Sequence, residues 1–177
     1  MAKTKTDTIK REVYLQLSII AAITLLVLGG LAFWGHRFIG DMVQTELAAQ
    51  KVYFPEKGSP AFDPAEYGDI QHYAGQLVDT PAEARAYANG FIGRHLQKVA
   101  DGKVYAEVSA AAMKNPDDKK LQQQKQTLFQ GETLRGLLLT SGYGIGTAGE
   151  IAGIAAYAAF ALSGGLLLIA ATLRSRS

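Results

Sequence analysis

The chain has 177 residues, of which 18 are basic and 16 acidic, and it contains no cysteine. This length allows one modest folded domain together with membrane segments. The nearly balanced charge argues against a nucleic-acid partner, which would need a concentrated positive surface. Without cysteine an exported domain cannot form disulfides and must be held together by its core. The absence of cysteine fits a bacterial plasma membrane better than a eukaryotic secretory route.

A first apolar segment lies close to the N-terminus. Residues 13–36, between Glu12 and Arg37, carry no formal charge, and Tyr14 and Trp34 stand near its ends, where interfacial aromatics are favoured. Because about 20 apolar residues span a bilayer core, this segment predicts a transmembrane helix. A cleaved signal peptide is the alternative, but the run is longer than a signal-peptide core and no A-x-A site follows it directly. We therefore interpret it as an uncleaved signal anchor.

A second uncharged segment lies between Glu150 and Arg174. It predicts a second transmembrane helix, which together with its outer lead-in covers residues 143–173. A buried core helix is the alternative for a single apolar run. A soluble fold would have to bury both runs beneath amphipathic helices, and this chain has too few residues that could form them. The transmembrane interpretation is therefore preferred.

Basic residues beside the two spans set the expected orientation. The tail of residues 1–12 carries four Lys or Arg, and the tail of residues 174–177 carries Arg174 and Arg176. Because cytoplasmic flanks are enriched in Lys and Arg, both tails are expected in the cytoplasm, and residues 37–142 form a long region that crosses largely regardless of charge. The predicted fold is a membrane all-α protein of the plasma membrane: a two-helix transmembrane hairpin with a mainly helical extracytoplasmic domain.

The extracytoplasmic region is expected to contain helices around one irregular stretch. Helix should continue through residues 37–51, and Pro and Gly residues then predict an ordered, loop-rich segment over 52–80. The run Thr80-Pro81-Ala82-Glu83 has the features of a capping box and predicts a helix start. The buried face of that helix is predicted from spacings of three and four to contain Ala84, Tyr87, Ala88, Phe91, His95 and Val99. Further helices are expected over 104–114 and from Pro116 towards the membrane.

Small residues in and before the second span indicate a helix-packing face. Gly142, Gly146, Gly149 and Gly153 follow one another at spacings of four, three and four, and small residues on one face let transmembrane helices approach closely. The answering face on the first span is expected to comprise Ser18, Ala22, Gly29 and Ala32. The letters Gly144-x-Gly146-x-x-Gly149 also match a dinucleotide-binding fingerprint, but neither a βαβ unit nor a downstream acidic residue accompanies them, so no cofactor is expected.

Glu150 is the one acidic residue beside the second span. A carboxylate inside the bilayer costs about 2.5 kcal/mol or more. An antiparallel hairpin would bring His36 and Arg37 to the same level, so we expect Glu150 to form an ion pair with one of them on the outer side. A solvated glutamate at the interface is the alternative.

Residues that support catalysis or metal binding are sparse in this sequence. The three histidines, His36, His72 and His95, are far apart and match no zinc spacing. Asp69 precedes His72 by three positions, which gives a weak acid–base candidate without a partner nucleophile. We therefore expect no catalytic, cofactor-binding or metal-binding residues.

Four blocks of the extracytoplasmic region carry a family resemblance. They read Lys51-Val52-Tyr53-Phe54-Pro55, then Gln71 with Tyr73-Ala74-Gly75-Gln76, then Ala86-Tyr87-Ala88 with Phe91-Ile92 and His95-Leu96, and finally Phe129-Gln130-Gly131-Glu132-Thr133-Leu134-Arg135-Gly136-Leu137-Leu138-Leu139. Over residues 51–140 the chain resembles a group of uncharacterised two-span membrane proteins of actinobacteria, which implies a plasma-membrane home and no established activity. Some members carry the label of aromatic-ring-opening dioxygenase. That chemistry needs iron held by histidine and carboxylate ligands, and no such cluster is visible in this sequence.

The sequence favours a non-catalytic role in the bacterial cell envelope, as an accessory, scaffold or assembly subunit that docks through its extracytoplasmic domain. The expected partners are the lipid bilayer and either another membrane protein or further copies of the chain. An oligomeric channel or transport component is the alternative, because polar residues inside the spans would mark its path. An envelope enzyme is a third possibility, which requires His72 to lie in a closed pocket with carboxylates.

Overall fold

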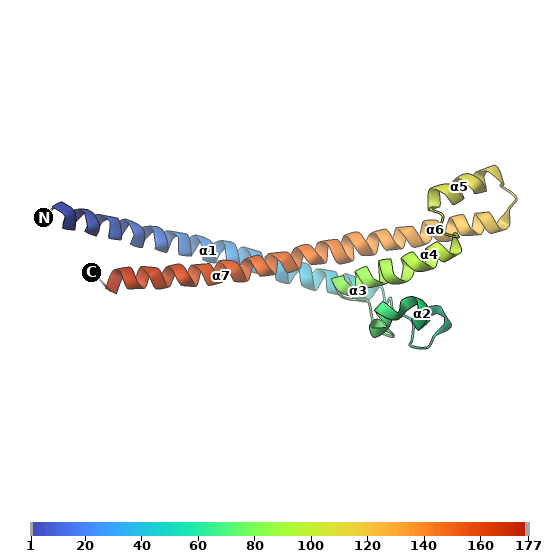
Figure 1. Ribbon diagram of the computed structural model, residues 1–177, viewed down its shortest axis with the longest axis horizontal. Coiled ribbons are helices and arrows are strands. Elements are labelled where there is room, and N and C mark those ends of the chain that lie inside the picture. The colour runs from blue at the N-terminus through green and yellow to red at the C-terminus, as the bar shows by residue number, and fades with distance from the viewer. Residues whose placement is uncertain (1, 176–177) are drawn as a thin grey trace. The chain divides into compact units, whose positions relative to one another are not determined.

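The computed structural model describes Ala2–Ser175, with side chains from Lys5 onward. Arg176, which belongs to the predicted C-terminal tail, lies outside the described residues. The chain is helical almost throughout, as predicted (Figure 1). Within Ala2–Ser175 the one extended pairing is an isolated bridge between Tyr53 and Leu77.

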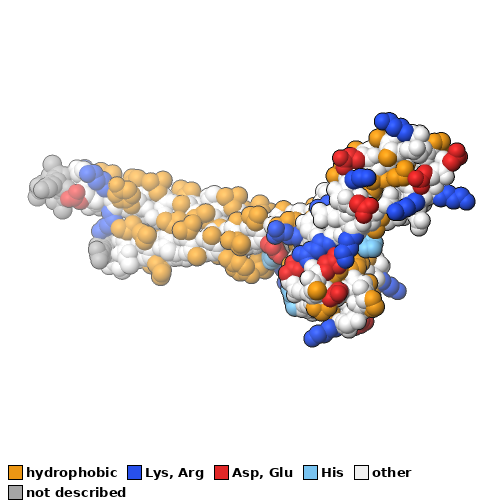
Figure 2. Space-filling view, turned by 45° about the vertical axis from the view of Figure 1, so that its right-hand side comes forward, with side chains coloured by type: hydrophobic (Ala, Val, Ile, Leu, Met, Phe, Trp, Pro, Cys, Tyr) orange, Lys and Arg blue, Asp and Glu red, His pale blue; other side chains and the backbone are white. Residues whose placement is uncertain are grey.

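The chain divides into two compact units, which are described separately. Unit 1 comprises Met1–Gly40 and Ala148–Ser177, and unit 2 comprises Asp41–Thr147. Figure 2 shows hydrophobic side chains along the helices of unit 1, whereas charged side chains of both signs gather on unit 2. The two units therefore present surfaces of different chemistry.

Two long helices supply unit 1. α1 covers Ala2–Ala49 and α7 covers Ile145–Ser175, and both are long and apolar enough to cross a membrane, as predicted. Only 11% of the most apolar stretch of the first helix is buried, and 17% of that of the second. The core helix of a soluble protein would bury most of such a stretch, so these helices do not have the burial that the core-helix alternative requires.

Unit 2 is built from short helices and one longer helix. They are the 3₁₀-helices η1 (Pro60–Phe62) and η2 (Gly68–Tyr73), the α-helices α2 (Pro64–Tyr67), α3 (Pro81–Arg85), α4 (Arg94–Val99), α5 (Tyr105–Lys114) and α6 (Lys119–Leu137), and the π-helices η3 (Ala86–Gly93) and η4 (Leu138–Gly144). Helix is continuous from α6 through η4 into α7, so the predicted start of the second span near residue 143 is not marked by a break.

An aromatic cluster forms the core of the loop-rich segment and fastens it to η3. Phe54 stacks on Tyr73 with ring centroids 5.1 Å apart and meets Tyr87 edge-on at the same distance. Phe62 lies edge-on to Phe91, with centroids 5.8 Å apart. Such offset and edge-to-face pairs are favourable beyond the area they bury. This packing explains why a stretch rich in Pro and Gly is ordered, as the sequence predicts.

The capping box predicted at Thr80 is present. The Thr80 hydroxyl accepts a hydrogen bond from the Glu83 amide at 3.3 Å, and the Glu83 carboxylate accepts from the Thr80 amide at 2.9 Å and from the Asp79 amide at 3.0 Å. Pro81 occupies the first turn of α3, where no amide donor is needed. Three otherwise unsatisfied donors are thereby satisfied at one helix start.

Acid is expected to weaken this helix start. Burial raises the pKa of Glu83, but the hydrogen bonds from the Asp79 and Thr80 amides outweigh burial, and the pKa lies below its ordinary value. The carboxylate therefore contributes stability above the ordinary glutamate pKa of about 4.3, and this stability is lost as the pH falls through the lower folded-state value. In Glu83→Gln, which keeps an acceptor but cannot titrate, thermal unfolding between about pH 7 and about pH 3 should depend less on pH. An unchanged pH dependence would contradict this role for Glu83.

The buried face of the helix after Thr80 differs from the predicted one. Its buried side chains follow every fourth position, at Ala84, Ala88, Ile92, Leu96 and Ala100, and Gly90 is buried as well. In an α-helix a strict four-residue step drifts by roughly 40° around the axis, but η3 is a π-helix with wider turns, which offset this drift. His95 is consequently exposed rather than on the buried face. The remaining predicted positions, Tyr87, Phe91 and Val99, are half-buried.

Candidate functional site

Within unit 1, α1 and α7 pack against each other in opposite directions. Residue numbers rise along α1 as they fall along α7: Ala22 meets Ser163, Gly29 meets Phe160 and His36 meets Gly149. We call this line of contacts the seam. The buried positions of α7 in unit 1 are all small: Gly149, Gly153, Ala156, Ser163 and Ala170. Four of them, Gly149, Ala156, Ser163 and Ala170, recur every seven residues. A seven-residue repeat is typical of two helices that wind around each other with a left-handed twist.

Two of the four glycines in the predicted packing face lie against large side chains of unit 1. In unit 1, a Cβ added at Gly149 would lie 2.7 Å from Cγ2 of Ile39, and one added at Gly153 would lie 2.8 Å from Nδ1 of His36. Real Cβ atoms do not approach other atoms this closely. Only glycine fits these two positions without a shift of the neighbouring side chain.

The other two glycines belong to unit 2. A Cβ at Gly142 would lie 2.8 Å from that of Ala84 and 3.2 Å from Cδ2 of Leu47, and one at Gly146 would collide with the ring of Pro81. These glycines therefore let α1 and α3 approach the chain around η4. The four predicted glycines therefore do not form one packing face: two contact unit 1 side chains and two contact unit 2 side chains.

The small residues predicted to answer these glycines lie elsewhere along the seam. Ala22 is fully buried where its carbonyl accepts the Ser163 hydroxyl, and a Cβ at Gly29 would lie 2.8 Å from the Phe160 ring. Ser18 and Ala32 are half-buried on the same side of α1. The glycines of the seam thus face larger side chains, because the register brings residues 36–39, rather than 18–32, opposite Gly149 and Gly153.

Two polar contacts cross the seam. His36 Nδ1 lies 2.9 Å from the carbonyl oxygen of Gly149, and Ser163 Oγ donates to the carbonyl oxygen of Ala22 at 2.9 Å. An imidazole that carries a proton on Nδ1 donates the first of these hydrogen bonds. Both side chains thus contact backbone carbonyls of the opposite helix.

The predicted ion pair of Glu150 is not formed. Among residues 5–175, Glu150 has no basic nitrogen within 4.0 Å, and both Glu150 and Arg37 are exposed. The His36 ring is instead turned to the Gly149 carbonyl and packs over Gly153. Glu150 follows Gly149 by one residue, which rotates it by about 100° around the helix and away from the seam. The structure agrees with the alternative of an exposed glutamate.

Charged side chains on unit 2 are joined into pairs. Arg94 binds both carboxylate oxygens of Asp69 at 2.7 Å, and Lys98 pairs with Glu66. The hydrogen bond from Arg94 lowers the pKa of Asp69, and the same bond raises the pKa of Arg94. The exposed His72 therefore sits beside a carboxylate that is already paired with Arg94, which weakens the acid–base suggestion for His72 and Asp69.

Burial also raises the pKa of two tyrosines in the aromatic cluster. Desolvation, reinforced by the neighbouring Glu66 carboxylate, raises the pKa of Tyr67, and desolvation alone raises that of Tyr87. Both shifts favour the neutral phenol, as a packed aromatic core requires. They leave Tyr67 and Tyr87 protonated at neutral pH.

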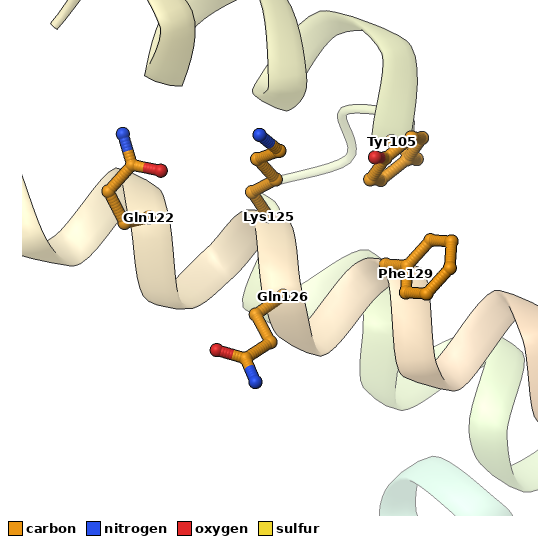
Figure 3. A pocket seen from close by; sticks show the side chains of 5 residues that line it. All are labelled: Tyr105, Gln122, Lys125, Gln126 and Phe129. Carbon is orange, nitrogen blue, oxygen red and sulfur yellow. The ribbon is translucent and has the colours of Figure 1, made fainter. Parts of the chain in front are cut away.

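Three cavities in unit 2 are candidate binding sites. The first, of about 390 Å³, lies between α5 and α6, where the rings of Tyr105 and Phe129 face each other and Gln122 and Lys125 project to the same side of α6 as Tyr105 (Figure 3). The second, of about 360 Å³, lies between α6 and the helix formed by η3 and α4. The third, of about 200 Å³, is lined by charged residues that include Lys103.

Metal ligands do not gather in the described part of the chain. Within residues 5–175, no group of three or more His, Cys, Asp or Glu side chains is arranged to hold a metal ion. The sites that sequence reasoning missed are the three cavities, because each combines residues from helices that are far apart in the sequence. Two features help to shape the second cavity, the π-helical turn and Gly131. Neither produces a distinctive pattern in a single sequence.

Comparison with known proteins gives this chain no relative. No protein-family model, no curated protein and no solved structure matches it.

Proposed function

We propose that this chain is an integral membrane protein that crosses the plasma membrane twice, with unit 1 in the bilayer and unit 2 as an extracytoplasmic docking module. One observation carries the proposal: away from the seam, α1 and α7 expose many large apolar side chains, among them Leu17, Ile20, Leu31, Ile154 and Leu168. Soluble monomers rarely expose contiguous apolar patches beyond a few hundred Å². A lipid environment accommodates such a surface.

The polar groups of unit 1 support the same proposal. Ser163 and His36 bond to backbone carbonyls across the seam, and Thr24 donates to the Ile20 carbonyl within α1 at 2.9 Å. Polar groups in hydrocarbon must find partners inside the protein. Because these side chains are engaged with backbone, they favour helix packing over the polar path of the channel alternative.

The proposed role is that of an accessory, scaffold or assembly subunit of the cell envelope. Unit 2 presents paired charges and open cavities, which suit recognition of another molecule. The resemblance to two-span actinobacterial membrane proteins is consistent with a bacterial plasma membrane and an uncleaved signal anchor. The proposed partner is another membrane protein or a further copy of the chain.

Orientation is tested with single cysteines, because the chain has none of its own. In intact cells, a cysteine at Lys57 in unit 2 should react with a membrane-impermeant maleimide. A cysteine at Ser175, beside the basic C-terminal tail, should react only after the membrane is permeabilised. Labelling of Ser175→Cys but not Lys57→Cys in intact cells would reverse the proposed topology.

The scaffold role is tested by purification in a mild detergent followed by mass measurement of the intact complex. A defined complex with one other membrane protein in fixed stoichiometry would support the accessory role. A homo-oligomer that conducts ions in planar bilayers would instead establish the channel alternative. A monomer that remains monomeric after cross-linking in cells would contradict both.

A further inference from the structure

We infer that unit 2 binds an uncharged, largely apolar small molecule in the second cavity, the groove between α6 and the helix formed by η3 and α4. The inference goes beyond the proposed scaffold role and does not depend on it. The groove has a volume of about 360 Å³. This volume falls within the range of about 300–1,000 Å³ that is usual for small-molecule sites.

The walls of the groove are apolar. Phe91, Ile92 and Leu96 form one wall, and Leu134 and Gly131 contribute to the other. No Asp, Glu, Lys or Arg is among the residues that line it. A charged ligand would lose water here without gaining a counter-charge, which is costly. The other two cavities differ, because Lys125 lines one and Arg94 and Glu132 are among the charged residues of the other.

Three polar side chains at the groove can recognise a neutral hydrogen-bonding group. They are His95, Thr127 and Gln130. Within the described residues none of the three makes a side-chain hydrogen bond to the protein, whereas Gln122 and Gln124 on the same helix bond to backbone carbonyls. An apolar site with a few converging polar groups is the usual arrangement for binding a small molecule in a defined orientation. The chemistry fits a ligand with one hydroxyl or carbonyl group on an apolar body.

Two backbone features shape this groove. Phe91 and Ile92 belong to the π-helix η3, a rare conformation that is frequent at functional sites. The π-helical turn also brings His95 out of the buried face, so that it lines the groove. At Gly131 an added Cβ would lie 2.5 Å from Cδ2 of Leu96, so glycine is needed for the two helices to approach there. Both features cost stability and are explained together by a binding site.

The experiment uses the full chain in lipid nanodiscs and a neutral photoreactive probe, 3-trifluoromethyl-3-phenyldiazirine. After irradiation, labelled residues are mapped by mass spectrometry. Labelling of residues 91–96 and 127–134 should saturate with probe concentration, whereas labelling of lipid-facing residues in α1 and α7 should rise in proportion to it. The carboxylate-bearing form of the same diazirine should not saturate the groove, because no Lys or Arg side chain lines it.

Ala61 and Ala65 provide a matched pair of variants. Each follows a capping residue and a proline, in Ser59-Pro60-Ala61 and Asp63-Pro64-Ala65, and each donates its amide to the capping side chain. Both alanines are exposed, but only Ala61 lines the groove. Ala61→Trp should fill the groove and weaken probe binding at least about tenfold, equivalent to about 1.4 kcal/mol. Ala65→Trp should leave binding unchanged.

Labelling of α1 and α7 serves as the internal control for both variants, since neither substitution lies in those helices. Circular dichroism and thermal unfolding check that both variants fold. Three results would overturn the inference: groove labelling that never saturates, equal effects of the two tryptophans, or saturable labelling confined to Tyr105 and Phe129 in the first cavity.

Discussion

Phe54→Ala is expected to remove a large part of the stability of unit 2. The Phe54 side chain is only 1% exposed and contacts the rings of Phe62, Tyr73 and Tyr87. Truncation of a buried phenylalanine costs about 3–5 kcal/mol through lost burial and the cavity left behind. Domains are stable by only about 5–15 kcal/mol, so the variant should unfold at much lower denaturant concentration. Urea titration of the chain in mild detergent, followed by near-ultraviolet circular dichroism of its tyrosines, measures the change.

The neighbouring residue supplies the control for this prediction. Tyr53 is 55% exposed and takes part in the extended bridge to Leu77 through its backbone. Tyr53→Ala removes an aromatic ring of similar size, yet it should change stability by no more than about 0.5 kcal/mol. Similar losses in the two variants would show that the aromatic cluster does not stabilise unit 2.

Gly153→Leu is expected to disrupt the seam in unit 1. The new Cβ would lie within 3.0 Å of three atoms of the His36 ring, which Gly149 holds by a hydrogen bond. The ring must move and lose that bond, so the expected cost is about 1–3 kcal/mol from overpacking and about 1 kcal/mol from the lost hydrogen bond. Fluorescence energy transfer between labels on cysteines introduced at Lys10 and Leu173, measured during titration with a denaturing detergent, reports helix separation.

Gly165→Leu is the matched control, because it makes the same change in the same helix. A Cβ at Gly165 meets no atom within 4 Å. This variant should separate at nearly the same detergent concentration as the original chain, and so should Leu168→Ala, at a position that is 70% exposed. Early separation of the Gly165 variant would mean that added bulk anywhere on α7, rather than at the seam, disrupts packing.

Local signals in the sequence predicted the local structure well. The two uncharged runs predicted both long apolar helices, and Thr80, Pro81 and Glu83 predicted the start of α3. These features depend on residues that are close together in the chain, where composition and capping chemistry decide the outcome. They fix where a helix begins without specifying what it packs against.

The errors came from register and from distant contacts. His95 was misplaced because periodicity assumes uniform α-helical turns, whereas η3 is π-helical. The partners of Gly149 and Gly153 depend on how α1 and α7 are staggered, which no local pattern specifies. The predicted ion pair of Glu150 rests only on its position along the helix axis. It neglects the rotation around that axis, which turns Glu150 away from the seam. The groove is lined by both Ala61 and Leu134, residues more than 70 positions apart in the sequence, and no local pattern predicts that they share a cavity.

The seven-residue spacing of small side chains on α7 has a consequence for how this sequence diverges. At Gly149, Gly153, Ala156, Ser163 and Ala170, selection is expected to retain small side chains, because these positions are buried in the seam. At exposed positions between them, such as Ile154 and Leu168, large apolar side chains can replace one another, because these positions do not face the seam. Distant descendants should therefore keep this interval of small residues after overall identity has faded, and the interval is a better guide to kinship than hydrophobicity.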